Sequence, residues 1–533
     1  MKRLSHLVAS LGASTAGRWL TSFAIILLLS LCWSFATPLF ASPDEPSHVT
    51  RAASVARGQL LGRTPHPSLQ RGELEVRVPT IFGSGGNIGC LAFQPDQTAN
   101  CIRFRGSTKI SEVGTTAGRH PPLYYAAVGW PSLLYPSAFG VRVMRVISAL
   151  LAAALLASAV TALSFVRSGR LAAVGLAVAV TPMVLFLNGV VNPSGVEIAA
   201  GICLWAAGAA LVVEAETEVR PILVTITGVA ACVLALTRQL GPLWLGITGV
   251  LLAWVGGRAA VLALLRSRRF LVWSAAAVVC SAAQVGWVAS VGALDASSSQ
   301  TAGFPNVGAS TLLKGSIGRS FIYYRELIGV FGWRDTSPPS LVVVIWTAAI
   351  GATVVLAVLL SNRRAVGAIG AVAFLTFALP VLFEVQSGHS AGYFWQGRYT
   401  LPLAAGIPIV AAITSASSGA SARLPIGRLL TVVAVGLGVA QVLAFGQAIR
   451  RYAVGVHGVL NFFTDTRWSP LGGAILLCTL FALGCVAWYA WLFAAVRSGA
   501  DETPVAADGA ARSSRVEASP APTRSPDPPR APR

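Results

Sequence analysis

The sequence predicts an all-α integral membrane protein with about twelve membrane-spanning helices. Of its 533 residues, 54% are hydrophobic and only 11% are charged, and the mean hydropathy is +0.68. A soluble domain carries about 25% charged residues, so this chain lacks the polar side chains that would cover a surface in water. The apolar residues also gather in runs of about 20, the length that crosses a bilayer.

The apolar runs divide the chain into three predicted parts: an N-terminal segment at 1–18, a membrane domain at 19–498, and a tail at 499–533. The tail is rich in Pro, Ala, Ser and Arg, which is typical of disorder. No cleavable signal peptide is predicted, because the first apolar run is long enough to span. The predicted spans are 19–40, 141–166, 171–190, 195–213, 221–237, 240–256, 270–292, 339–360, 365–384, 399–415, 428–448 and 471–496.

The positions of the cations orient this bundle, because cytoplasmic loops are enriched in Lys and Arg. With both termini in the cytoplasm, the short inner loops carry most of the cations near the spans. These cations are Lys2, Arg3, Arg18, Arg167, Arg170, Arg258, Arg266, Arg268, Arg269, Arg363, Arg364, Arg423, Arg428 and Arg497. Arg450 and Arg451 fall outside, against the rule. The stretch 122–137 must not cross, since a crossing there would move every later basic loop outside.

The outer face receives the long connections, at about 41–140, 293–338, 385–398 and 449–470. We expect the first of these to carry short helices, and we expect the polar chemistry to lie on this extracytoplasmic side. The net charge of +20 does not indicate nucleic acid, because the Lys and Arg residues stand singly or in pairs between apolar runs, without a recognisable nucleic-acid module.

Two cysteines, Cys90 and Cys101, lie close together in the first outer segment. They are candidates for a disulfide if that segment faces an oxidising compartment, and the absence of a nearby Cys or His pair disfavours zinc. The outer histidines also lack the close spacing of a zinc site. We therefore predict no metal site and no cofactor, with a divalent ion left as an open alternative.

Adjacent carboxylates follow the first span at Asp44 and Glu45, between Pro43 and Pro46. Each proline restricts its own backbone and that of the residue before it. Neighbouring carboxylates in low-dielectric surroundings repel each other, which favours one that accepts a proton, and such a group beside a dry cleft can act as a general base. The structural alternative is that Asp44 caps a following helix by accepting backbone N–H bonds.

Two further motifs carry cations at proline-containing helix ends. Arg119 and His120 precede Pro121-Pro122-Leu123-Tyr124-Tyr125, which is either an interfacial anchor or a cradle for a phosphate or sugar. Gln396-Gly397-Arg398-Tyr399 lies at the outer end of a span. An arginine there either snorkels to headgroups or grips a phosphate with its planar fork.

A last motif, Gly332-Trp333-Arg334-Asp335-Thr336, stands just before a span. Its Asp335 is expected to pair with Arg334 or with another loop. Glu197, near Ser194 at an outer helix start, and Glu384 are weaker signals.

Taken together, these motifs make the chain resemble DUF2142, a bacterial family of multi-spanning proteins of unknown function. The motifs that carry the resemblance occur in order over about 20–495, and they are Asp44-Glu45-Pro46-Ser47-His48, His120-Pro121-Pro122-Leu123-Tyr124-Tyr125, Gly332-Trp333-Arg334-Asp335-Thr336 and Gln396-Gly397-Arg398-Tyr399. More distantly, the layout is similar to that of GT-C membrane glycosyltransferases. One departure is Ser194, where members of the DUF2142 family often have an acidic residue.

The GT-C resemblance implies a GT-C-like bundle that transfers a sugar from a polyprenyl-phosphate donor to a cell-envelope glycan or glycolipid. Asp44 then matches the catalytic base best, with Glu45 as the alternative. The substrate-binding residues implied are His48, Arg119, His120, Tyr124, Asp335, Gln396, Arg398 and Tyr399.

The expected setting is a bacterial plasma membrane, with the lipid bilayer as a partner, and the Ala-, Arg- and Gly-rich composition is typical of a high-GC organism such as an actinobacterium. A flippase of lipid-linked sugars and a non-catalytic envelope-assembly protein are the alternatives, and they rest on the same fold-level analogy.

Overall fold

The structure is a computed structural model, and it describes residues 14–63, 72–83, 88–104, 106–166, 169–215, 219–294, 303–418, 421, 424–464 and 466–496. The predicted tail at 499–533 and most of the predicted N-terminal segment lie outside the described residues.

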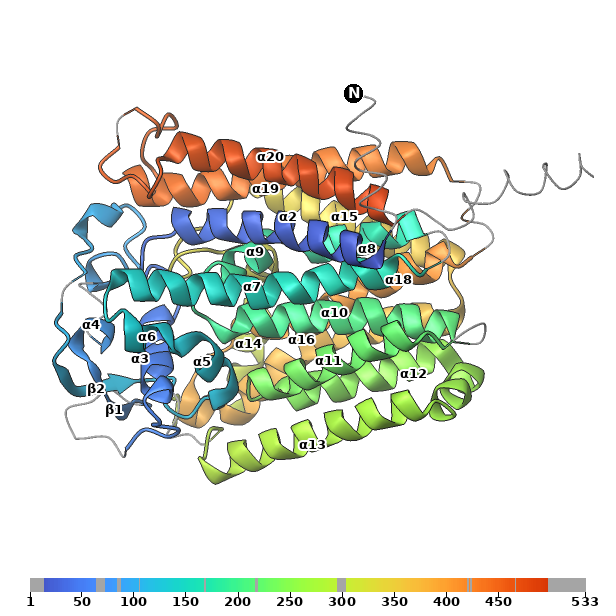
Figure 1. Cartoon of the computed structure of the whole chain (residues 1–533), viewed down its shortest axis with the longest axis horizontal. Coiled ribbons are helices and arrows are strands. Elements are labelled where there is room, and N and C mark those ends of the chain that lie inside the picture. The colour runs from blue at the N-terminus through green and yellow to red at the C-terminus, as the bar shows by residue number, and fades with distance from the viewer. Residues whose placement is uncertain are drawn as a thin grey trace, which may run out of the picture.

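Long helices that run side by side form the body of the molecule (Figure 1). Each predicted span corresponds to one helix or to two consecutive shorter ones. They are α2 (Thr15–Ala36), α7 (Ala138–Leu163), α8 (Gly169–Ala179) with α9 (Pro182–Asn188), α10 (Pro193–Glu214), α11 (Pro221–Thr237), α12 (Gly241–Leu265), α13 (Arg268–Ser290), α15 (Ser340–Leu360), α16 (Arg363–Ala391), α17 (Gly397–Ala404) with α18 (Gly406–Ala416), α19 (Ile426–Val454) and α20 (Ala474–Ala495).

In the described part of the chain, ten spans are long and apolar enough to cross a membrane, with α17 and α18 counted as one. The α8–α9 pair, bent by 68°, can form an eleventh. Helix α11 is also apolar but has only 17 residues. The predicted all-α membrane fold is therefore confirmed.

Helix α10 forms the centre of the bundle. All of its residues except Val213 are buried, as expected for a helix that is apolar on every side, whereas most of α13 is exposed or half-buried. Small residues let the neighbours of α10 come close. A Cβ on Gly201 would lie 2.8 Å from the carbonyl oxygen of Pro402 in α17.

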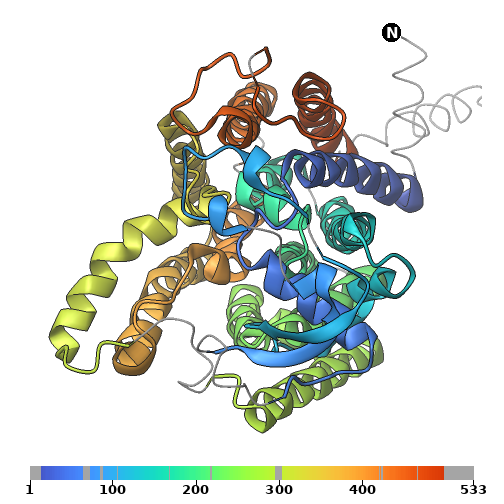
Figure 2. The ribbon, with the colours of Figure 1, turned by 90° about the vertical axis from the view of Figure 1, so that its left-hand side faces the viewer.

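The first outer segment folds over one end of the bundle, which we call the loop end (Figures 1 and 2). It contains α3 (Glu45–Ala56), β1 (Leu74–Pro79), α4 (Thr80–Gly83), η1 (Ile88–Cys90), η2 (Ala99–Cys101), β2 (Ile110–Thr115), α5 (Pro122–Gly129) and α6 (Pro131–Leu134). The short helices were expected, but the antiparallel pairing of β1 with β2, from Leu74↔Thr115 to Pro79↔Ile110, was not. Helices α5 and α6 have 8 and 4 residues, too few to cross a bilayer.

The segment 293–338 contains a long helix that was not predicted, α14 (Ala309–Ile328). Figure 2 shows it lying across the end of the bundle. It is amphipathic, with Leu313, Ile317 and Phe321 exposed at four-residue spacing, so a search for continuous apolar runs passes over it. On its buried side, Ser316 and Tyr323 each donate a hydrogen bond of 2.6 Å to Glu384 of α16.

Candidate functional site

A cleft of about 470 Å³ opens at the loop end of the bundle. Segments far apart in the sequence line it, including the start of α3, the turn between α11 and α12, and the segment between α16 and α17. The polar residues that line it include Asp44, His120, Glu197, Arg238, Arg334, Gln396 and Tyr399. Aromatic side chains, Trp244, Tyr393 and Trp395 among them, form much of the remaining wall.

Asp44 lines this cleft and forms an ion pair with Arg398 of α17. It stands at the N-cap position of α3, but its side chain makes no capping hydrogen bond, so the structural alternative for Asp44 is wrong. Its backbone is left-handed, with φ of 61°, a conformation that Asp tolerates better than most residues. Because the carboxylate is 26% exposed, it is accessible from the cleft.

Glu45, the next residue, faces the opposite environment and is fully buried. Its two oxygens accept hydrogen bonds from Nε and Nη2 of Arg145 at 2.7 and 2.6 Å. They also accept from the backbone N–H groups of Phe40 and Val191, at 2.9 and 3.0 Å. This carboxylate therefore ties the start of α3 to the connection after α2, to α7 and to the segment between α9 and α10.

Two arginines, the half-buried Arg238 and the buried Arg398, flank the ring of Tyr399. The guanidinium carbon of Arg238 lies 4.6 Å from the ring centroid, and that of Arg398 lies 5.3 Å from it. Arg238, at the end of α11, donates to Ser194 at 2.9 Å and to Glu197 at 3.3 Å. Sequence reasoning missed Arg238, although a lone arginine in a short turn between two predicted spans, on the outer side, was a signal.

Several nitrogen atoms of these arginines have no hydrogen-bond acceptor among the described residues. They are Nε and Nη1 of Arg398 and Nε of Arg238, and all three are buried. Gln396, which lines the cleft, likewise has a buried side-chain oxygen without a donor. Buried polar groups are normally paired, so this cluster is suited to a polar ligand.

A tyrosine hydroxyl joins two histidines beside the cleft. The Tyr125 hydroxyl lies 2.9 Å from Nδ1 of His48 and 3.0 Å from Nδ1 of His120. Burial lowers the pKa of His48 well below its usual value, and the cations of Arg398 and Arg238 lower it further. Burial likewise lowers the pKa of His120. Both rings are therefore neutral at pH 7, and the hydroxyl can donate to one ring and accept from the other.

Three of the residues expected to bind substrate lie elsewhere. The hydroxyl of Tyr124 hydrogen-bonds to Ser148 at 2.7 Å within the bundle. The side chain of Arg119 donates to the carbonyl of Gly72 at 3.5 Å. Asp335 is buried and pairs with Arg451 at 3.0 Å, not with Arg334. Asp44, His120, Gln396 and Tyr399 do line the cleft, while Arg398 and His48 contact residues that line or adjoin it.

A comparison with known protein families bears on the identity of the chain. The DUF2142 family model, whose description is a predicted membrane protein, matches residues 27–407. The chain belongs to the DUF2142 family. No curated protein and no solved structure is similar to it. The matched segment of this DUF2142 protein contains every residue named above as lining the cleft.

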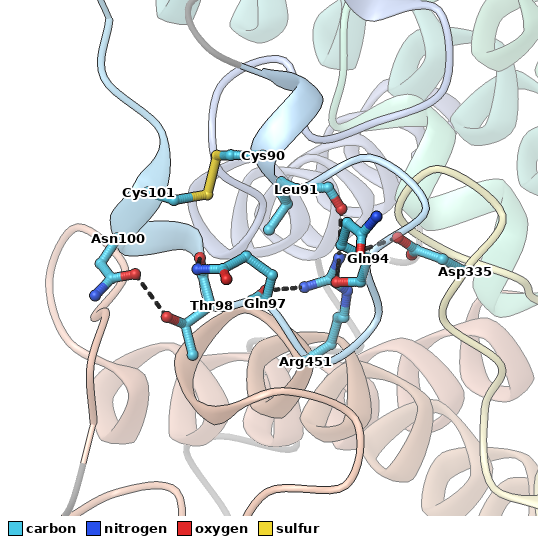
Figure 3. The surroundings of a disulfide bond; sticks show 9 residues. All are labelled: Cys90, Leu91, Gln94, Gln97, Thr98, Asn100, Cys101, Asp335 and Arg451. Atoms are coloured by element: carbon cyan, nitrogen blue, oxygen red, sulfur yellow. Dashed lines mark hydrogen bonds and ion pairs between the residues drawn. A yellow bond between two sulfur atoms is a disulfide. The ribbon is translucent and has the colours of Figure 1, made fainter.

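Helix α19, beyond the matched segment, braces the first outer segment of this DUF2142 protein (Figure 3). Besides Asp335, Arg451 donates to the carbonyl oxygens of Leu91, Gln94 and Gln97 at 2.9, 3.0 and 2.6 Å. The loop that it holds is closed by a disulfide between Cys90 and Cys101. Arg451, which the predicted orientation places outside against the positive-inside rule, therefore has a structural role in holding this loop.

The described residues contain no group of three or more His, Cys, Asp or Glu side chains placed to hold a metal ion. In the cleft, Asp44 and Glu197 each face an arginine. Such a site can bind an anion through its cations and accept a proton through its one partly exposed carboxylate.

Proposed function

We propose that this DUF2142 protein is a membrane glycosyltransferase. It transfers a sugar from a polyprenyl-phosphate donor to a glycan or glycolipid of the bacterial cell envelope, at a loop end that faces away from the cytoplasm. One observation supports this most strongly. An accessible carboxylate, Asp44, lies beside a buried arginine with unpartnered donors, in a cleft at the end of a membrane bundle.

The reaction needs one base and one stabilised leaving group. Asp44 takes the proton of the acceptor hydroxyl while the hydroxyl oxygen bonds to the anomeric carbon of the sugar. The bond from that carbon to the lipid phosphate breaks, and its electron pair stays on the phosphate oxygen. Arg398 stabilises the negative charge that develops there. No nucleotide is required, because the phosphate ester is itself the leaving group.

Glu45 has a different task in this proposal. Four donors already occupy its two oxygens, so it has no free acceptor for a hydroxyl proton. It positions the connection from which Asp44 projects, and Asp44 is the base.

A lipid-linked sugar transporter is the second candidate, and one observation favours it. The bent α8–α9 pair can form a discontinuous span, a feature of many transporters. The cleft residues argue against it, because transporter sites lie near the bilayer midplane and these residues gather at the loop end.

The replacement Asp44→Asn tests the proposal. It keeps the shape of the side chain but removes the base, so sugar transfer should fall by about 10²–10⁴-fold. The measurement is transfer from a panel of polyprenyl-phosphate sugars in proteoliposomes, normalised to folded protein. Glu112→Gln on β2 is the matched control and should keep wild-type transfer.

If the Asp44→Asn protein transferred sugar at the wild-type rate, Asp44 would not be the general base. Movement of the lipid-linked sugar across the liposome membrane, without transfer, would favour the transporter.

A further inference from the structure

We infer that Arg238 and Arg398 together bind one phosphate group, and that the bound phosphate replaces Asp44 as the partner of Arg398. The identification of that phosphate as the head of a lipid-linked donor rests on the proposed function. The anion site and the exchange of partners rest on the geometry of the two arginines.

The two guanidinium groups come from distant parts of the chain and meet at one ring. Both lie within 5.3 Å of the centroid of Tyr399, which lines the cleft with Arg238. Their unpartnered nitrogens, two on Arg398 and one on Arg238, are buried donors. A phosphate offers several acceptor oxygens in the geometry that a guanidinium fork matches, so one such group can satisfy donors of both arginines.

Asp44 covers the approach to Arg398. Asp44 lines the cleft, whereas Arg398 is not among the residues that line it and its side chain is only 5% exposed. An anion that enters from the cleft and reaches Arg398 must therefore take the place of the Asp44 carboxylate. The two anions compete for the same cation, because like charges at one arginine repel each other.

Asp44 is also the carboxylate that can leave. The Glu197 side chain, the partner of Arg238, is 1% exposed, whereas that of Asp44 is 26% exposed. Moving a buried carboxylate such as Glu197 away from its cation leaves an uncompensated charge in a dry environment. A carboxylate already in contact with the solvent of the cleft regains hydration when it moves, so the exchange takes place at Asp44.

The exchange links donor binding to the base. While Asp44 is paired with Arg398, the guanidinium group engages its carboxylate. Once a phosphate occupies Arg398, the Asp44 carboxylate is released beside the bound donor and can accept a hydrogen bond from the acceptor hydroxyl. The base therefore becomes available when the sugar donor is in place.

Binding of farnesyl phosphate to the full chain in lipid nanodiscs, measured by calorimetry, tests the inference without any turnover. Farnesol and inorganic phosphate are titrated in parallel, so that the chain and the head group are probed separately. Arg238→Ala and Arg398→Ala should each weaken binding by about tenfold or more, the effect of losing a hydrogen bond to a charged group. Asp44→Asn should tighten it by about threefold or more, because the competing charge is gone.

Matched controls come from the sheet of the loop end. Arg77→Ala on β1 and Glu112→Gln on β2 remove one cation and one carboxylate outside the cleft, and both should bind like the wild type. If Asp44→Asn does not fold, Glu197→Gln serves as the second variant. It removes the other carboxylate that faces the pair and should also tighten binding.

The outcomes separate the inference from the proposed function. Unchanged or weaker binding in a folded Asp44→Asn protein, or unchanged binding in Arg238→Ala, overturns the exchange site even if sugar transfer is found. The expected binding pattern without transfer from any donor contradicts the glycosyltransferase and supports the anion site. Equal affinity for inorganic phosphate assigns the site to a soluble phosphate and contradicts the lipid donor, while tight binding of farnesol alone overturns the anion site.

Discussion

At the residue scale, the peptide bond between Asp44 and Glu45 separates two carboxylates with opposite environments. Asp44 turns into the cleft toward Arg398, and Glu45 turns into the bundle toward Arg145. The left-handed backbone of Asp44 makes this divergence possible. The buried Glu45–Arg145 pair positions the chain. The partly exposed Asp44 carboxylate is accessible for chemistry.

Replacing Glu45 should therefore reduce mainly the stability of the folded protein. Glu45→Gln leaves Arg145 buried without its counter-charge, which typically costs about 3–5 kcal/mol. We expect a lower thermal unfolding midpoint in detergent. The double variant Glu45→Gln/Arg145→Met should recover much of the loss, and Asp44→Asn should shift the midpoint far less. Equal shifts for Asp44→Asn and Glu45→Gln would contradict the different environments.

The two histidines that share Tyr125 predict the direction of the pH dependence. Burial lowers the pKa of His48 and His120 in the folded protein, whereas in the unfolded chain both protonate near pH 6.5. Below about pH 6.5 the unfolded state therefore binds more protons than the folded state. The free energy of unfolding keeps its full value above about pH 6.5 and falls as the pH drops below it. With two sites, the slope approaches about 2.7 kcal/mol per pH unit.

Unfolding midpoints recorded between pH 7.5 and pH 5 check this expectation. A His48→Gln/His120→Gln protein should lose most of the acid sensitivity. The exposed His457 provides the control, and His457→Gln should follow the wild type. An unaltered pH profile in the double variant would show that other groups cause the effect.

At the element scale, glycines set how closely the helices behind the site approach. A Cβ on Gly201 of α10 would lie 2.8 Å from Pro402, and one on Gly406 of α18 would lie 2.5 Å from Trp205. Helix association in lipid depends on such close packing. These contacts hold α17, which carries Arg398 and Tyr399, against the central helix.

A larger residue in this contact should destabilise the bundle and loosen the site. Gly201→Val forces α10 and α17 apart, and overpacking of this kind typically costs about 1–3 kcal/mol. A Cβ on Gly246 of α12 would meet no heavy atom within 4 Å, so Gly246→Val is the control. The thermal unfolding midpoint should fall for Gly201→Val and stay unchanged for Gly246→Val. A similar fall for both variants would show that a β-branched residue destabilises these helices regardless of packing.

At the scale of the whole molecule, several arginines of the loop end are buried inside the structure. Arg145 and Arg451 are buried beside carboxylates and backbone carbonyl groups. Such cations serve packing rather than topology, so they do not conflict with an orientation read from the inner loops. The orientation itself is open to a direct test.

Thiol labelling in intact cells tests on which side the loop end lies. The Cys90–Cys101 disulfide is at this end, while the free cysteines lie within membrane helices. A membrane-impermeant maleimide should label the protein only after treatment with an impermeant reductant. A Cys90→Ser/Cys101→Ser protein should stay unlabelled, and labelling of the wild type only in permeabilised cells would place the loop end in the cytoplasm.

The predictability of the site follows the range of the interactions involved. Asp44, Arg398, Gln396 and Tyr399 were found because proline-fixed motifs at helix ends are local. Arg238 was missed because it lies at the end of α11, and its approach to Tyr399 depends on how distant helices pack. Tyr124 was expected to bind substrate, yet its hydroxyl bonds to Ser148 within the bundle. Asp335 was expected to bind substrate, yet its partner, Arg451, lies 116 residues further along the chain.

The sequence by itself determined the membrane fold, because apolar runs of spanning length have no stable place except lipid, and it located the segments that carry polar groups. The tertiary structure decided what those groups do. It buried Glu45 against Arg145, turned Asp44 to Arg398, and brought Arg238 to the same ring. The physical reason is that apolar runs are a local property, whereas pairing between charges requires helices distant in the sequence to pack side by side.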